Sequence, residues 1–354
     1  MKGVILTAGK GTRLLPLTQE ISKCMLPIGG KSIVQRSLDI MCKFNFIEEI
    51  CILTNKDNLK QIQEQFKDNY KGKKIIYILQ DIEKYGMGTA SAILSTKEFI
   101  EDKCALIMAG DIIVDGEDVE EMVMKYKDEN VNAMLLKTVP DPHNFGIVIL
   151  NGNDRVIDIE EKPEEPKSNL INGSVYLFTS GDMKYLENIK LSKRNEYEVT
   201  DALTRMSLEG KLYGFVAKGY WNDVGTPLSV LESNAELMKK NENEISMEEN
   251  VNIENCEIEG PCFISKNVVL KNVKVKPYSF IGEKCLIENS EIYNSMVLEK
   301  SKINSSKLQD CLIGTNNTLE ENEIKNENGK FGCVSGPNVV FEKGLKVGKE
   351  SKIK

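Results

Sequence analysis

Aliphatic residues recur every five or six positions through the last part of the chain. A helix repeats about every 3.6 residues and a strand every 2, so this spacing suits neither. It is typical of a hexapeptide β-helix, in which each short strand points one aliphatic residue inward. The repeating residues are Ile253, Ile258, Ile264, Leu270, Val275, Ile281, Ile287, Ile292, Val297, Ile303, Leu308, Ile313 and Leu319.

Small residues are expected to turn the corners of this β-helix, namely Gly282, Ser290, Ser295 and Gly314. The pattern lapses at 320–330 and returns weakly at Val347 and Ile353. An irregular β-rich tail is the alternative. A polar stretch without periodicity, 241–250, indicates a linker. We therefore expect one domain over 1–240, this linker, and a β-helix domain over 251–354.

The first 240 residues alternate apolar runs with amphipathic ones. Five runs are expected to be buried strands, at 3–8, 49–54, 74–79, 104–109 and 133–138. Helical patterns lie between them at 32–45, 57–70, 88–99 and 117–130. This alternation predicts a doubly wound α/β domain with a mixed, mostly parallel sheet covered on both faces. Ligands of such domains bind at the carboxyl ends of the strands.

Charge and composition exclude several classes of protein. The net charge is −8, which argues against a nucleic-acid partner because such proteins usually carry a basic face. The single histidine, His143, argues against Ser-His-Asp or Cys-His chemistry. Nine cysteines without a C-x-x-C pair predict reduced thiols and a cytoplasmic location. The sequence contains no run of about twenty apolar residues, so no membrane-spanning segment is expected.

The first strand runs into the loop Gly9-Lys-Gly11-Thr12-Arg13. Glycines let backbone N–H groups approach phosphates closely, and Arg13 and Lys23 would add positive charge. The dinucleotide fingerprint fails because its third glycine is replaced by Leu14. A P-loop over 25–32 fails because its first position is Met25.

This loop, followed by Lys23-Cys-Met-Leu-Pro27, resembles the signature of the sugar-1-phosphate nucleotidylyltransferase family. The hexapeptide tail resembles that of the long-form glucose-1-phosphate thymidylyltransferases, which implies a left-handed β-helix. Further segments match in the family's order: Gln80, Gly86-Met-Gly-Thr-Ala90, Gly110-Asp111, Phe145-Gly146, Glu161-Lys162-Pro163, 172–176, 194–201 and Trp221-Asn-Asp223-Val-Gly225-Thr-Pro227.

The resemblance implies a role for each matching residue. Arg13, Lys23 and Lys162 are the expected catalytic cations, and Mg²⁺ is expected on Asp111 and Asp223. Gln80 is expected to read the base edge. The nucleotide is expected at Leu6, Ala8, Gly9, Gly11, Thr12, Arg13, Gln80, Gly88, Thr89 and Asp111. The sugar phosphate is expected at Gly146, Glu161, Lys162, Asn172, Tyr176 and Arg194.

Electrostatics makes this inventory coherent. A phosphate oxygen is an ionised nucleophile at pH 7 and needs no general base. The obstacle is repulsion between a dianionic sugar phosphate and a triphosphate of charge about −4, which amounts to several kcal/mol even at an effective dielectric of about 20. Catalysis must come from cations and positioning. The expected reaction is in-line displacement at the α-phosphorus, with release of pyrophosphate.

Ordinary structural roles compete with some of these assignments. Asp111 could be only a turn residue, and Asp223 could cap the helix that starts near Pro227. Glu161 and Lys162 could be a solvated pair, and Tyr176 could belong to the core.

The sequence also departs from the family pattern. The order Gly173-Ser174 does not decide which substituent the sugar carries at C2. The 86–90 element favours UTP and dTTP about equally as the nucleotide. Glucose 1-phosphate is the favoured acceptor. The alternatives are a GTP-dependent mannose-1-phosphate guanylyltransferase and a catalytically inactive regulatory homologue. Relatives with an acetyltransferase β-helix use a histidine base, and this tail has none, so we expect no acetyltransferase activity. The tail is expected to support a homo-oligomer or an allosteric face.

Overall fold

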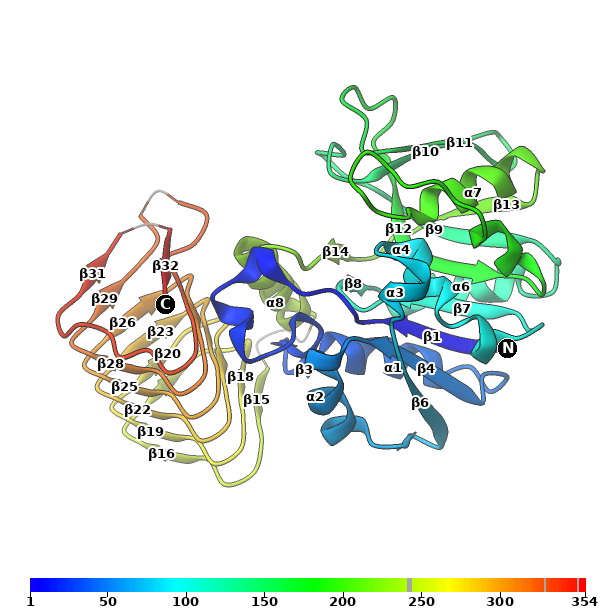
Figure 1. Cartoon of the computed structure of the whole chain (residues 1–354). Coiled ribbons are helices and arrows are strands. Elements are labelled where there is room, and N and C mark those ends of the chain that lie inside the picture. Colours follow the sequence, from blue (N-terminus) through cyan, green and yellow to red (C-terminus); the bar gives the residue numbers. More distant parts are fainter. Residues whose placement is uncertain (241–243, 328, 349) are drawn as a thin grey trace. The chain divides into compact units, whose positions relative to one another are not determined.

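The computed structural model describes residues 1–240, 244–327, 329–348 and 350–354 (Figure 1). The chain forms two compact units. The first unit comprises residues 1–9 and 33–222, and the second unit comprises residues 10–32 and 223–354. This division groups residues differently from the domain ranges expected from the sequence. Residues 241–243 of the predicted linker lie outside the described residues.

A ten-stranded mixed sheet forms the centre of the first unit. Its strands follow the order β11-β10-β12-β7-β1-β4-β6-β5, and β9 pairs with β12 and β13. Pairing is parallel among β7, β1, β4 and β6 and antiparallel where β12, β10 and β11 extend the sheet. The strands are β1 (Lys2–Leu6), β4 (Glu49–Thr54), β5 (Asn69–Tyr70), β6 (Lys73–Leu79), β7 (Ala105–Ala109), β9 (Asn132–Thr138), β10 (Gly146–Leu150), β11 (Val156–Glu161), β12 (Leu170–Phe178) and β13 (Leu212–Val216).

Helices cover both faces of this sheet. Met41 of α1 lies over Gly3 of β1. The next residue, Val4, belongs to a core cluster with Ile93 of α4 and Leu203 of α7. Neighbouring residues of a strand face opposite sides, so the predicted doubly wound fold is confirmed. The helices are α1 (Ile33–Cys42), α2 (Lys56–Phe66), α3 (Ile82–Tyr85), α4 (Thr89–Leu94), α5 (Lys97–Ile100), α6 (Gly116–Tyr126) and α7 (Val199–Leu208).

The carboxyl ends of the parallel strands meet along one edge of the sheet. The Thr7 N–H donates to the Leu53 carbonyl at 2.7 Å, and the Gly110 N–H donates to the Leu6 carbonyl at 2.8 Å. Gln80 follows β6 and donates its N–H to Thr54 at 2.9 Å. This is the edge at which doubly wound domains bind their ligands.

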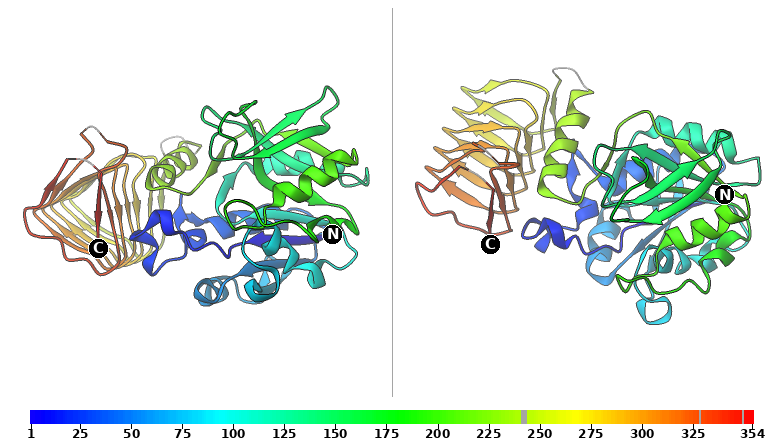
Figure 2. Two further views of the ribbon diagram at one scale, coloured as in Figure 1. Left: turned by 45° about the horizontal axis from the view of Figure 1, so that its top comes forward. Right: turned by 90° about the horizontal axis from the view of Figure 1, so that it is seen from above.

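The second unit contains a left-handed parallel β-helix of three sheets, as predicted (Figure 2). The first sheet is β15 (Ile245–Met247), β18 (Cys262–Ile264), β21 (Phe280–Ile281), β24 (Met296–Val297), β27 (Leu312–Ile313), β30 (Cys333–Ser335) and β32 (Ser351–Ile353). The second is β16 (Asn252–Glu254), β19 (Val269–Lys271), β22 (Leu286–Glu288), β25 (Lys302–Asn304) and β28 (Thr318–Glu320). The third is β17 (Glu257–Ile258), β20 (Lys274–Val275), β23 (Glu291–Tyr293), β26 (Lys307–Gln309), β29 (Glu323–Ile324) and β31 (Lys346–Val347).

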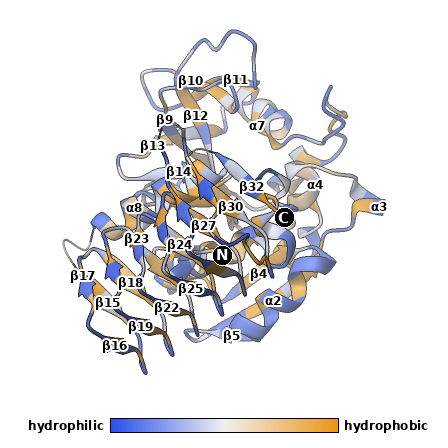
Figure 3. Cartoon of the chain, turned by 90° about the vertical axis from the view of Figure 1, so that its left-hand side faces the viewer, coloured by the Kyte–Doolittle hydropathy of each residue, from blue (hydrophilic) through white to orange (hydrophobic). Residues whose placement is uncertain are grey.

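The repeating aliphatic residues from Ile264 to Leu319 form the buried core of this β-helix. Many of the strands carry a hydrophobic residue, orange in Figure 3, beside hydrophilic ones in blue, whereas the two-residue strands β21, β24 and β27 are hydrophobic throughout. Ile253 differs from the expectation, because 40% of it is exposed. It lies on β16, the first strand of its sheet, which has a neighbouring strand on one side only. The lapse of the pattern at 320–330 corresponds to a longer coil. Met296 pairs with Leu312 on the next coil, whereas Leu312 pairs with Val334, which lies further along the chain.

Asparagine occupies many corners of the β-helix, which the sequence analysis missed. Asn255, Asn272 and Asn289 have left-handed backbones, and their side-chain amides stack in a ladder with N···O distances of 2.8 and 3.0 Å. Asparagine tolerates this conformation better than most residues. Gly282 and Gly314 do not use it. A Cβ at either position would collide with backbone atoms of the next coil, so close stacking requires these two glycines.

Two further parts of the second unit pack on the β-helix. Helix α8 (Pro227–Lys239) carries Asn234, whose Oδ1 accepts the Gly29 N–H at 2.9 Å and whose Nδ2 donates to the Tyr278 carbonyl at 2.8 Å. The segment 10–32 contains the short turns η1 (Thr12–Leu14), η2 (Leu17–Gln19) and η3 (Lys23–Met25) and the strands β2 (Pro27–Ile28) and β3 (Lys31–Ser32). None of the helices in the described residues is long and apolar enough to cross a membrane.

Candidate active site

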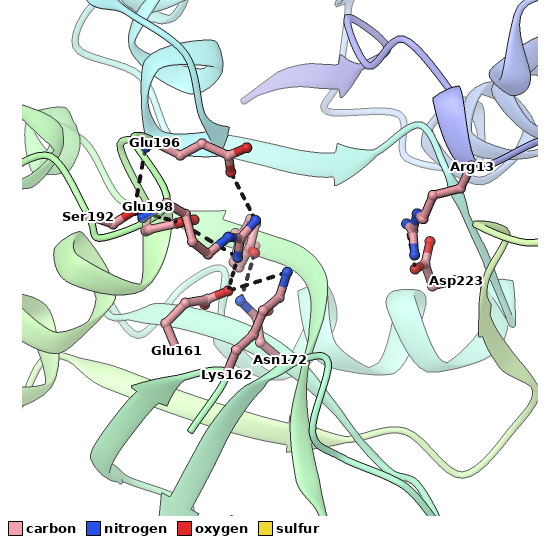
Figure 4. Close-up of polar contacts among 10 residues, drawn as sticks. Arg13, Glu161, Lys162, Asn172, Ser192, Glu196, Glu198 and Asp223 are labelled. Carbon is pink, nitrogen blue, oxygen red and sulfur yellow. Dashed lines mark hydrogen bonds and ion pairs between the residues drawn. The ribbon is translucent and has the colours of Figure 1, made fainter. Parts of the chain in front are cut away.

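The residues expected to bind the sugar phosphate come together in the first unit. Gly146 at the start of β10 pairs in register with Glu161 at the end of β11. Asn172 lies on the neighbouring strand β12. A Cβ at Gly146 would lie 3.1 Å from Glu161 Oε2 and 3.6 Å from Asn172 Cβ, so the three residues are close neighbours. Arg194, in the loop before α7, reaches the same cluster through Glu161. Figure 4 shows Glu161, Lys162 and Asn172 close together.

Glu161 is the electrostatic centre of this cluster. Arg194 Nη1 lies 3.3 Å from Glu161 Oε1, and Lys162 Nζ lies 4.0 Å from the same oxygen. Burial nevertheless raises the pKa of Glu161, and the charge of Glu198 raises it further, while Lys162 and Arg194 act in the opposite direction. Glu161 is therefore not a fully solvated carboxylate, whereas Lys162 is exposed, as the alternative of a solvated pair held.

Arg194 is shared among three carboxylates. It contacts Glu196 at 3.1 Å and Glu198 at 3.7 Å in addition to Glu161. Glu198 is buried and accepts a hydrogen bond from Ser192 Oγ at 3.1 Å. We did not single out Glu198 from the sequence, although it lies inside the matching segment 194–201. Its burial is a property of the fold that this segment alone does not reveal.

Tyr176 belongs to the core, as the purely structural interpretation held. Its hydroxyl accepts a hydrogen bond from Asn172 Nδ2 at 2.9 Å, and Asn172 Oδ1 accepts the Ser174 N–H at 3.0 Å. The pairing of β12 with β9 shifts register between Asn172 and Tyr176, which is the mark of a bulge. Burial raises the pKa of Tyr176, so the hydroxyl stays protonated at neutral pH. Tyr176 therefore fixes the orientation of Asn172.

Gly88 has a backbone reason to be glycine. Its φ is +124°, and a Cβ there would overlap the Tyr197 carbonyl oxygen. The Tyr197 N–H donates to Met87 at 2.8 Å, and the Tyr197 carbonyl accepts the Ala90 N–H at 3.0 Å. The 86–90 turn, with Thr89 at the start of α4, is thus bonded to the segment that carries Arg194. The contact of Gly88 with a base stays a prediction.

The other predicted nucleotide residues of the first unit lie at the carboxyl edge of the sheet. Leu6 ends β1, and the carbonyl of Ala8 accepts a hydrogen bond from Asn55 Nδ2 at 2.8 Å. Gly9 is exposed. Asp111 follows β7, and its charge contributes to the raised pKa of Tyr176.

The second unit gathers the cations that the family resemblance assigns to the triphosphate. Arg13 Nη2 lies 3.4 Å from Asp223 Oδ2 (Figure 4). Lys23 Nζ lies 3.7 Å from Asp223 Oδ1. The side chain of Arg13 is 62% exposed, whereas that of Lys23 is 9% exposed. One carboxylate thus faces two cations, one in contact with solvent and one enclosed by its surroundings.

Two local features position the side chain of Arg13. Thr18 Oγ1 donates to the Gly11 carbonyl at 2.9 Å, which closes the loop around Thr12. A Cβ at Gly225 would lie 2.5 Å from Arg13 Nη2, so glycine leaves the space that the guanidinium occupies. The sequence pattern contained Gly225 but gave no reason for it.

Asp223 does not cap helix α8. Thr226 is the cap, because its side chain accepts the Ser229 N–H at 3.2 Å and Ser229 Oγ accepts the Thr226 N–H at 3.0 Å. The capping role considered for Asp223 is therefore wrong.

Asp111 in the first unit and Asp223 in the second are both aspartates, whose oxygens suit a hard cation. Mg²⁺ usually binds one or two carboxylates together with substrate phosphates. The described residues contain no group of three or more His, Cys, Asp or Glu that could hold a metal ion alone. The donor chemistry fits a Mg²⁺ that is bound together with a nucleotide.

Comparison with known proteins gives a consistent result. The family model described as nucleotidyl transferase matches residues 2–240. The chain is 35% identical to the bifunctional protein GlmU of Methanocaldococcus jannaschii, over 98% of this chain and 92% of that protein. It is 31% identical to a bifunctional sugar-1-phosphate nucleotidylyltransferase/acetyltransferase of Sulfurisphaera tokodaii, over 86% of this chain and 76% of that protein.

Among solved structures, a putative glucose-1-phosphate thymidylyltransferase from Bacillus anthracis in complex with a sucrose is similar. The TM-score is 0.61 and the sequence identity 30%. The match covers 67% of this chain and 95% of the solved chain.

Proposed function

Because this chain belongs to the nucleotidyl transferase family, we propose that it transfers the nucleotidyl group of dTTP or UTP to a hexose 1-phosphate and releases pyrophosphate. Glucose 1-phosphate is the proposed acceptor. The observation that carries the proposal is the cluster in the first unit, where Glu161 and Asn172 can bind hydroxyl groups beside the cations Lys162 and Arg194. A sugar that bears a phosphate needs both kinds of contact.

The sugar side binds and orients the acceptor. The Glu161 carboxylate accepts hydrogen bonds from sugar hydroxyls, and Asn172 is held for the same purpose by Tyr176. Lys162 has φ +44° and donates its N–H to the Phe145 carbonyl at 3.1 Å. A non-glycine residue in that conformation costs about 1 kcal/mol or more, so the surrounding structure holds Lys162 in place. Lys162 and Arg194 would hold the phosphate dianion that attacks the nucleotide.

The phosphate side supplies positive charge to the triphosphate. Arg13 is expected on the β- and γ-phosphates and Lys23 on the α-phosphate, where they stabilise the charge of the leaving pyrophosphate. Arg13 and Lys23 both lie beside Asp223. A bound triphosphate would therefore be a second anionic partner for each cation. Mg²⁺, when bound, would neutralise further charge on the phosphates, with Asp111 and Asp223 as its proposed ligands. The attacking phosphate oxygen is already ionised, and no general base is required.

The choice of substrates rests on fewer residues. Gln80 at the end of β6 is the proposed reader of a uracil or thymine edge. The thymidylyltransferase name of the solved relative agrees with that choice. Amino-sugar 1-phosphates are a second acceptor class to be tested against the same residues, because they carry the same phosphate and most of the same hydroxyl groups. A guanylyltransferase for mannose 1-phosphate and a catalytically inactive homologue are the competing functions that the experiment must distinguish.

The decisive experiment measures pyrophosphate release with Mg²⁺ over a grid of substrates. The nucleotides are UTP, dTTP, GTP and CTP, and the acceptors are the 1-phosphates of glucose, mannose, galactose, glucosamine and N-acetylglucosamine. We expect release with glucose 1-phosphate and UTP or dTTP. Release confined to an amino sugar or to mannose and GTP would replace the proposed substrates. If folded protein binds a nucleotide sugar but releases no pyrophosphate with any substrate pair, the inactive homologue would be favoured.

The same purified protein can be tested for acetyl transfer, the second activity in the name of the Sulfurisphaera tokodaii relative. Acetyl-CoA and glucosamine 1-phosphate are supplied, and acetylated product is measured. Residues 244–354 contain no histidine, so we expect no product. Turnover would contradict that prediction and leave the nucleotidyl transfer proposal intact.

A further inference from the structure

In the second unit, the segment 10–32, called the loop below, contacts the last coil of the β-helix, which begins at β30. Gly336, which follows β30, faces the turn 16–20 of the loop. A Cβ at Gly336 would lie 2.8 Å from Gln19 Oε1 and 3.3 Å from Pro16 Cβ. The turn therefore rests directly on the backbone of the coil.

Asn338 makes a polar contact beside this one. Its Nδ2 donates to Glu20 Oε1 at 3.0 Å, and its Oδ1 accepts from Asn316 Nδ2 at 2.7 Å. Its backbone is left-handed, with φ +58°, like the other asparagines of the corners. One end of the amide stacks on Asn316 of the preceding coil, and the other end holds Glu20 of the loop.

A third contact reaches the residue that carries the charge. Lys352 Nζ, on the final strand β32, lies 3.5 Å from the carbonyl oxygen of Arg13. At the other end of the loop, the Phe263 ring of β18 lies against Gly30. The loop is thus supported by the β-helix near both of its ends.

The loop has little internal structure to hold this shape. Its regular elements are three short 3-10 turns of three residues each and a two-stranded sheet of two-residue strands. Such turns have poor hydrogen-bond geometry. Ordering a flexible segment when a ligand binds reduces affinity, so support that orders it beforehand increases affinity.

We propose that the last coil of the β-helix, through Gly336 and Asn338, positions residues 11–23 of the loop so that Arg13 and Lys23 are oriented to bind the triphosphate. This inference rests on the proposed function and deepens it. Asn338 is a positioning residue that acts through Glu20 and is not a catalytic one. The β-helix is then part of the nucleotide-binding machinery.

The test replaces the amide by a carboxylate in Asn338→Asp. Aspartate tolerates the left-handed backbone, but it removes the donor and places a negative charge opposite Glu20. We expect the KM for the nucleotide to rise about three- to tenfold, with the KM for the sugar phosphate and kcat changed less than about twofold. Amide hydrogen exchange in residues 11–23 is expected to become faster.

Two further variants separate positioning from general damage. Glu20→Lys in the Asn338→Asp background restores opposite charges and is expected to restore nucleotide KM and slow exchange. Asn272→Asp is the matched control, because Asn272 stacks on Asn255 and Asn289 at an earlier corner of the β-helix. It is expected to leave the loop unchanged.

The outcomes distinguish this inference from the proposed function. Hydrogen exchange needs no turnover, so it tests the contact even if no substrate pair releases pyrophosphate. Unchanged exchange in the loop of Asn338→Asp would overturn the inference. An equal increase in Asn272→Asp would also overturn it, since the effect would then be loosening of the whole β-helix. Faster exchange with an unchanged nucleotide KM would overturn the link to binding.

Discussion

Two clusters, here named after their proposed ligands, are built in different ways: the sugar side around Glu161 in the first unit and the phosphate side around Asp223 in the second. On the sugar side, Asn172 and Tyr176 are four residues apart in the chain, and Gly146 pairs with Glu161 on neighbouring strands. On the phosphate side, Arg13 and Asp223 are 210 residues apart. Strand register fixes the first set locally. The second set depends on distant segments of the second unit.

This difference predicts which substitutions disturb the geometry of the sugar side and which disturb that of the phosphate side. Sugar-side residues sit on strands of a large sheet and are oriented by short-range hydrogen bonds. Phosphate-side cations sit on short turns, and their position depends on contacts with residues 223–354. Variants that damage one half should therefore leave the KM for the other substrate nearly unchanged.

The largest expected effect tests the sugar side at its cation. Lys162→Met should lower kcat/KM for the sugar 1-phosphate about 10²- to 10³-fold, because it removes a charge beside the attacking phosphate. Lys167→Met is the matched control. Lys167 pairs with Asp158 and Glu160 on the surface, where such pairs contribute little, so kcat/KM should change less than about twofold. Equal effects of the two variants would contradict the proposed role of Lys162.

A glycine on the phosphate side gives the next largest effect. Gly225→Ala places a Cβ where the Arg13 guanidinium lies, so the nucleotide KM should rise about tenfold while the sugar KM stays constant. Steady-state kinetics with each substrate varied in turn measures this. Gly152→Ala is the control, because a Cβ there meets nothing within 4 Å. A change in the sugar KM of Gly225→Ala would break the separation between the two sides.

A smaller effect sharpens the account of the sugar side. Tyr176→Phe removes the hydroxyl that holds Asn172, and the sugar KM should rise about three- to tenfold, as expected for one lost hydrogen bond. Tyr126→Phe is the control, since its hydroxyl donates to the Gly214 carbonyl in the same unit. If both variants raise the sugar KM equally, Tyr176 acts only through the core.

The smallest expected effect is a shift in pH dependence. Burial and the charge of Glu198 raise the pKa of Glu161, so protonation of Glu161 should weaken sugar binding at a higher pH than an ordinary carboxylate would. Glu198→Gln removes the like charge and lowers the pKa of Glu161. The acid limb of kcat/KM for the sugar phosphate should then move to lower pH. A limb that moves to higher pH would show that Glu198 acts mainly by holding Arg194.

Much of the fold was predictable because it follows local periodicity. The α/β alternation and the aliphatic repeat from Ile264 to Leu319 are confirmed. The asparagine ladder was missed because we looked for small residues at the corners, whereas the left-handed backbone favours asparagine at Asn255, Asn272 and Asn289. The support of Glu20 by Asn338 joins residues 318 positions apart, and no local pattern signals such a contact.

The candidate site shows the same limit. Motif resemblance identified Glu161, Lys162 and Arg194, which the structure brings together. It gave no sign that Glu198 is buried beside them or that Gly225 makes room for Arg13, since both depend on packing. The cytoplasmic location and the homo-oligomer stay predictions.

The hydrogen bonds of Tyr197 have a consequence for the order in which substrates bind. Its backbone bonds on both sides to the 86–90 turn, so this turn and the segment that carries Arg194 form one mechanical piece. A base bound against the turn would also set the position of Arg194, the proposed ligand of the acceptor phosphate. The kinetic scheme expected from this linkage is compulsory order, with the nucleotide binding first and the nucleotide sugar leaving last.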